Sequence, residues 1–68
     1  MAVDIIRLKG IIKDSGMTMV SIANKSNIRR ETLYNRLAGK GEFTVSEVNG
    51  LTKTLRLTRD ERDEIFLG

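Results

Sequence analysis

The chain has 68 residues, the size of one domain and close to the lower limit for folding without disulfides or metals. It contains no cysteine and no histidine, which excludes disulfides and thiolate metal sites and removes the commonest catalytic base. Its net charge is only +3, from 12 Lys and Arg against 9 Asp and Glu. No apolar run approaches the roughly 20 residues of a membrane span, so a membrane protein is not expected.

The first helix is predicted over residues 3–15. Its apolar residues recur at spacings of three and four, which places them on one helical face. These residues are Ile5, Leu8 and Ile12. Asp4 lies in the first turn, and Gly16 fits the left-handed residue that ends a helix. Gly10 inside the helix costs about 1 kcal/mol relative to alanine, so either a neighbour packs closely there or the helix tolerates the loss.

A second, short helix is predicted from Thr18, which caps it, to about Lys25. Asn27 then suits a left-handed turn residue. A third helix follows at once over residues 29–38, and two glycines soon after it end it. The residues expected to face inward are Ile22 and Ala23 in the second helix and Leu33 and Leu37 in the third.

Two capping boxes predict the last two helices. Thr44 and Glu47 open a fourth helix to about Leu55, and Thr58 and Glu61 open a fifth. The residues expected to face inward are Val45, Val48, Leu51 and Leu55 in the fourth helix and Ile65 and Phe66 in the fifth. No strand pattern, repeat or flexible linker is visible. We therefore expect an all-α fold, a compact five-helix bundle in which residues 1–68 form a single domain.

The charges are unevenly distributed along this chain. Residues 25–40 hold five basic residues against Glu31, a local charge of +4, whereas residues 57–68 hold two arginines against four carboxylates, a local charge of −2. This distribution indicates a surface that faces a polyanion on one side, with ordinary surface scatter as the alternative. The acidic residues of the last helix lack the spacing of a calcium loop. No residues resemble a nucleophile with its base, so an enzyme is not expected.

The link between the second and third helices is only about three residues long, from Ser26 to Ile28. So short a link forces the helices to cross steeply, which is the helix-turn-helix geometry, here over residues 18–38. The small Ala23 lets the helices approach each other. Because any steep helical hairpin can use such residues, structural packing remains the alternative to DNA binding.

These residues resemble the Cro/repressor-type helix-turn-helix family of phage and bacterial transcription regulators, which has the lambda-repressor-like fold. The likeness is carried by Thr18, Ala23, Asn27, Ile28, Thr32, Leu33, Leu37 and Gly39, and it covers nearly the whole chain. The segment 39–43 followed by a capped helix looks like short phage-type members from Gram-positive hosts. The chain departs from the family at Met19, where Gln commonly binds a phosphate, and at Asn27, where Gly is frequent.

The resemblance implies that the third helix is a recognition helix whose amino-terminal end enters the major groove. The implied base-reading residues are Arg29, Arg30, Glu31, Tyr34 and Asn35, and the implied phosphate contacts are Thr18, Lys25, Arg36 and Lys40. Arginine suits guanine and asparagine suits adenine, because each can form two hydrogen bonds to that base. Three alternatives remain: Glu31 complementing the helix dipole, Tyr34 as half-buried packing, and Arg36 as a solvated charge.

The resemblance further implies a sequence-specific regulator of double-stranded DNA, a Cro-like or small repressor protein of a phage or prophage. It would act in the bacterial cytoplasm, at the nucleoid, without a cofactor, small-molecule substrate or membrane partner. A recognition helix reads only a few base pairs, so we expect a homodimer on a pseudo-palindromic operator. Phe66 and Leu67 are the candidate dimer contacts. The alternative for Phe66 is that it is an ordinary core residue.

Two other interpretations stay open. The same fold can serve as a protein-interaction module, an antitoxin-like or antirepressor partner whose arginines meet an acidic protein. Met19 in place of Gln favours that possibility. The chain can also be the DNA-binding domain of a longer repressor, although the absence of a flexible linker after Leu67 favours a complete short protein.

Overall fold

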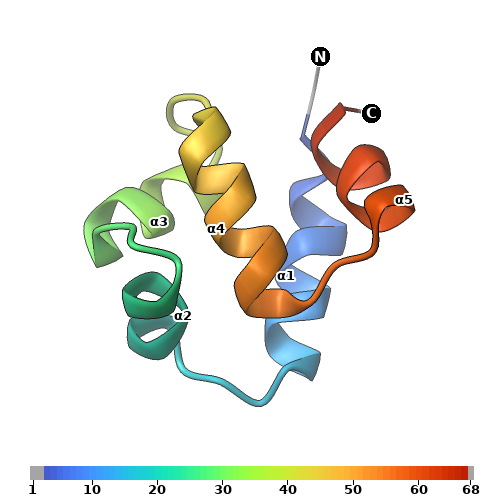
Figure 1. Ribbon diagram of the computed structural model, residues 1–68. Helices are drawn as coiled ribbons and strands as arrows, with labels where there is room; N and C mark the ends of the chain where they lie inside the picture. The colour runs from blue at the N-terminus through green and yellow to red at the C-terminus, as the bar shows by residue number, and fades with distance from the viewer. Residues whose placement is uncertain (1–2, 68) are drawn as a thin grey trace.

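The computed structural model describes residues 3–67, and this part of the chain forms helices and no strand (Figure 1). The elements are α1 (Ile5–Asp14), α2 (Met19–Lys25), α3 (Arg30–Leu37), α4 (Val45–Leu55), α5 (Arg59–Arg62) and a π-helical turn, η1 (Asp63–Leu67), that continues α5. The all-α prediction with five helices is confirmed. In the view of Figure 1, α4 runs through the middle, with α2 and α3 on one side and α1 and α5 on the other. Within residues 3–67, every helix is too short or too polar to cross a membrane.

The fourth and fifth helices begin at the two predicted capping boxes. The Glu47 amide donates to Thr44 Oγ1 over 3.1 Å, and the Thr44 amide donates to Glu47 Oε1 over 3.0 Å. Thr58 and Glu61 repeat the pattern over 3.1 and 2.9 Å. Thr58 donates hydrogen bonds to the Glu61 carboxylate, and these hold the pKa of Glu61 below its ordinary value. The bond from the Thr58 backbone has the larger effect, and the bond from its side chain has the smaller. Both starts are therefore defined locally, by side chains three residues apart.

The first and third helices are shorter than predicted at both ends. Asp4 is the N-cap of α1 and not a residue of its first turn, because its carboxylate accepts from the Arg7 amide over 3.1 Å. The Asp4 amide donates to the Ile65 carbonyl over 2.8 Å, which joins the start of α1 to the C-terminal turn. At α3, Arg29 has an extended backbone and occupies the N-cap position.

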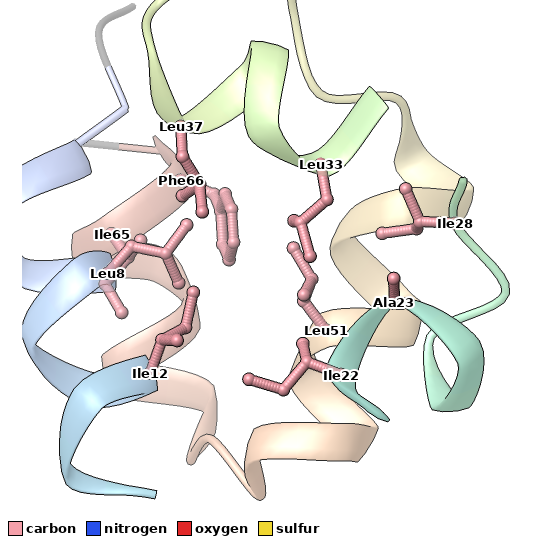
Figure 2. Close-up of a cluster of buried hydrophobic side chains, with 10 residues drawn as sticks. All are labelled: Leu8, Ile12, Ile22, Ala23, Ile28, Leu33, Leu37, Leu51, Ile65 and Phe66. Atoms are coloured by element: carbon pink, nitrogen blue, oxygen red, sulfur yellow. The ribbon is translucent and has the colours of Figure 1, made fainter. Parts of the chain in front are cut away.

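The core gathers apolar side chains from every helix except the short α5 (Figure 2). The buried residues are Leu8, Ile12, Ile22, Ala23, Ile28, Leu33, Leu37, Leu51, Ile65 and Phe66. Leu33 and Leu37 point inward from α3 toward Leu51 and Phe66 (Figure 2). The prediction is confirmed for all of the inward-facing residues of α2 and α3. It is wrong for Val45, which is 78% exposed at the first position of α4.

The turn between α2 and α3 packs directly against α4, which holds it in place. Asn27 has the predicted left-handed conformation, with φ of 56°. The hydroxyl of the buried Ser26 donates to Thr54 Oγ1 over 2.9 Å. The Ser26 carbonyl lies so close to Gly50 of α4 that a Cβ at that position would overlap it. The position of α3 therefore depends on a direct backbone contact between this turn and α4.

Gly10 resolves the choice that the sequence left open at α1. A Cβ added at Gly10 would meet nothing within 4 Å, and the residue is exposed. Because no neighbour requires glycine there, Gly10→Ala is expected to stabilise the protein by about 1 kcal/mol through helix propensity. Urea unfolding followed by circular dichroism measures this gain. An unchanged or lower free energy of unfolding would show that α1 needs glycine for a reason outside its contacts.

Candidate nucleic-acid interface

The third helix separates a buried apolar side from an exposed polar side. Leu33 and Leu37 are 0% and 7% exposed. All five candidate base-reading residues are exposed, namely Arg29, Arg30, Glu31, Tyr34 and Asn35. Within residues 3–67, neither Arg29 nor Arg30 forms an ion pair. The helix thus presents unpaired hydrogen-bonding groups to the outside while its leucines hold it to the core.

The amino-terminal end of α3 is suited to an anionic or hydrogen-bond-accepting ligand. Arg29 at the N-cap makes no side-chain capping hydrogen bond. The amides of the first turn consequently lack the partner that Thr18, Thr44 and Thr58 provide at the other helix starts. These amides and the positive end of the helix dipole point out at the same end as Arg29 and Arg30.

Arg36 is largely engaged inside the protein, which disfavours the phosphate contact expected from the sequence. Its Nε donates to Glu47 Oε1 over 3.3 Å, and its Nη1 donates to the Lys40 carbonyl over 3.3 Å. The paired side chains are only 22% and 15% exposed. A Cβ at Gly41, whose φ is +76°, would run into the same guanidinium. Arg36 therefore braces the loop between α3 and α4.

The other three candidate phosphate contacts are exposed. The ammonium group of Lys40 forms no ion pair within residues 3–67, and its backbone amide donates to the Asn35 carbonyl over 2.8 Å. The ammonium of Lys25 lies 3.9 Å from Met17 Sδ, a weak acceptor. Thr18 Oγ1 accepts the capping bond from the Ser21 amide over 3.1 Å, so its hydroxyl proton is still available for donation. These residues keep the donors that a phosphate contact requires.

An apolar groove borders the exposed side of α3. It has a volume of about 410 Å³, and Met19, Tyr34 and Leu37 line it together with Ile12 and two lysines of α1. Tyr34 is 52% exposed, so its ring is part of the groove wall and also reaches solvent. Met19 packs against the core. This groove distinguishes the surface beside α3 from a purely polar one.

The two candidate dimer residues lie in different environments. Phe66 is 6% exposed, and its ring packs edge-on against Phe43 with centroids 5.3 Å apart. Phe66 is thus a core residue, which was the alternative for it, and its remaining exposed edge lines the hollow beside Leu67. Leu67 is 53% exposed beside a hollow of about 490 Å³ that Val3 and Ile5 also line.

Comparisons of the chain with protein-family models, with curated proteins and with solved structures found no match.

Proposed function

We propose that this protein is a sequence-specific regulator of transcription that binds double-stranded DNA through a helix-turn-helix formed by α2 and α3. In this proposal the fold is of the lambda-repressor-like type, and α3 enters the major groove with its amino-terminal end first. The regulator is Cro-like or a small repressor, and it acts by occupying an operator. It needs no cofactor for this task.

The observation that supports the proposal concerns α3: the helix is held in a fixed position, and its exposed polar side chains remain available to a ligand. Arg30 and Asn35 are exposed, and neither side chain is engaged by another part of residues 3–67. Both residue types can form two hydrogen bonds to a single base edge. The turn before α3 is held against α4 at Gly50, so the helix presents these side chains in a defined position.

Selection of bound sites from random duplex DNA tests the proposal directly. A regulator of this type enriches a short motif with approximate two-fold symmetry, because two copies read two half-sites about one helical turn apart. Binding without enrichment of any motif would contradict sequence-specific recognition.

The size of the reading surface makes a dimer on DNA part of the proposal. One helix is too small a contact to select an operator among the roughly 10⁶ or more competing sites of a genome. Leu67 offers exposed apolar surface at the carboxyl-terminal end, beside Val3 and Ile5. We therefore place the contact between two copies at this end of the molecule.

Leu67→Ser is expected to weaken the cooperative binding of two copies by about 30-fold, because each copy loses roughly 1 kcal/mol of apolar burial and the dimer loses it twice. Titration into a labelled operator, with stoichiometry from analytical ultracentrifugation, should give a two-to-one complex for the parent protein. Ile6→Ser is the matched control, because Ile6 is 87% exposed and does not line this hollow. A one-to-one complex of full specificity would rule out the dimer.

A second candidate function is a protein-interaction module, and the groove lined by Met19, Tyr34 and Leu37 favours it. Lys9 and Lys13 flank this apolar surface and would suit a partner segment with acidic residues beside an apolar stripe. The same selection experiment separates the two functions, because a protein module would enrich no DNA motif.

A further inference from the structure

A polar cleft lies between the α2–α3 turn and α4, on a part of the surface that the recognition helix does not include. Its volume is about 530 Å³. The lining includes Lys25 and Asn27 from the turn region and Ser46, Asn49 and Lys53 from α4, and it contains no carboxylate. A cleft with two cationic side chains and no acidic one is suited to an anion.

The groups that line the cleft are free to bind a ligand. Within residues 3–67, the side chains of Asn27, Ser46, Asn49 and Lys53 form no hydrogen bond to another residue, and Lys53 forms no ion pair. Among the described residues, the Lys25 ammonium donates to no acceptor stronger than the Met17 thioether, at 3.9 Å. The cleft therefore combines ammonium, amide and hydroxyl donors, the groups that commonly contact phosphate oxygens.

The floor of the cleft is built from backbone. Gly50 lacks the Cβ that would overlap the Ser26 carbonyl, and the Ser26 hydroxyl is held by Thr54 at 2.9 Å. This close approach fixes the distance between the turn and α4, so donors from two separate elements face one cleft. The cleft also opens beside the start of α3, because Asn27 closely precedes Arg29.

We propose that this cleft binds a phosphodiester group of the DNA strand that borders the major groove on the α4 side, with Lys53 and Asn49 as its main contacts. The inference rests on the proposed function, since it requires the cleft to face that strand when α3 enters the groove. It adds α4 to the DNA-binding surface. An acidic protein segment is less suited, because no large hydrophobic side chain lines the cleft for the apolar residues of such a segment to pack against.

The test is the salt dependence of binding by Lys53→Gln. Loss of one phosphate contact lowers the slope of log Kobs against log salt by about 0.9 for each copy bound. Extrapolated from 1 M, this slope corresponds to about fivefold weaker binding per copy at 0.15 M salt. The weakening should be the same on operator and random DNA, because a phosphate contact carries no sequence information.

Arg59→Gln is the matched control for net charge, because Arg59 is exposed on α5 and does not line the cleft. Its slope should stay close to that of the parent protein. Equal slopes for Lys53→Gln and Arg59→Gln would overturn the phosphate site even if the operator is still bound. Failure of the parent protein to bind DNA would instead reject the proposed function.

The chemistry of the cleft also fits a free phosphate ion, and nuclear magnetic resonance distinguishes the two sources. Amide shifts of Ser46, Asn49 and Lys53 should respond to a short duplex at micromolar concentration. They should not respond to equimolar inorganic phosphate at constant ionic strength. Saturable shifts with inorganic phosphate and none with the duplex would show that the cleft binds the free ion and would overturn the DNA contact.

Discussion

Gly50→Ala is expected to lower the free energy of unfolding by up to about 2 kcal/mol, because adding a carbon where no space exists costs about 1–3 kcal/mol and the gain in helix propensity offsets about 1 kcal/mol of it. The added Cβ would meet the Ser26 carbonyl, which belongs to the backbone and cannot rotate away as a flexible side chain would. The Ser26 hydroxyl is bonded to Thr54, so the turn must shift as a unit. Urea unfolding of the variant measures this loss.

Gly10→Ala is the control for this substitution, because the same change on an open face of α1 should be stabilising by about 1 kcal/mol. The comparison removes helix propensity, which is common to both sites. Equal stability of the two variants would show that the turn moves freely and that α3 is not fixed by α4.

The sequence predicted the structural features that depend on residues close together in the chain. Thr44 and Thr58 cap helices through partners three residues away, and both capping boxes are present. Asn27 adopts the left-handed conformation that its side chain tolerates well. The inward faces of α2 and α3 also followed from helical spacing, because burial of one apolar face requires only the period of the helix.

Features that depend on contacts between distant elements could not be predicted in this way. Gly10 and Gly50 both lie inside helices, yet only Gly50 is in close contact with another element. A glycine inside a helix is one sign of a close approach, but which glycine has such a neighbour is known only once the helices are placed. Val45 fits the apolar spacing of α4, yet it is 78% exposed at the first position of the helix, so spacing alone did not predict its burial.

The sequence predicted the residue types of the candidate site, but only some of the individual residues that belong to it. Exposed arginines on a short helix after a tight turn are visible in the sequence, and the structure places all of the candidate base-reading residues on the surface. Arg36 has the same charge and lies on the same helix, yet it pairs with Glu47. Nothing local distinguishes it from Arg30, because the pairing arises when the start of α4 reaches the last turn of α3.

Arg30→Ala is expected to have the largest effect on DNA binding. A side chain that forms two hydrogen bonds to guanine contributes about 1–3 kcal/mol of discrimination, and a dimer uses Arg30 twice. The loss on the operator should therefore be about 2–6 kcal/mol, with relaxed preference at one base pair of each half-site. Fluorescence anisotropy with operator and random duplexes at matched salt measures both quantities.

Lys40→Ala gives the contrast that interprets this result. Lys40 is exposed in the loop after α3, where a contact to phosphate is expected, and its backbone bonds to Asn35 and Arg36 survive the substitution. The variant should weaken operator and random DNA alike and reduce the salt slope by about one per copy. If Arg30→Ala behaves in the same way, its guanidinium contacts the DNA backbone, and base recognition passes to the remaining exposed residues of α3. Arg30 is identified as a residue that reads a base only if two results are found together. The loss must be selective for the operator, and the salt slope must change no more than the removal of one charge accounts for.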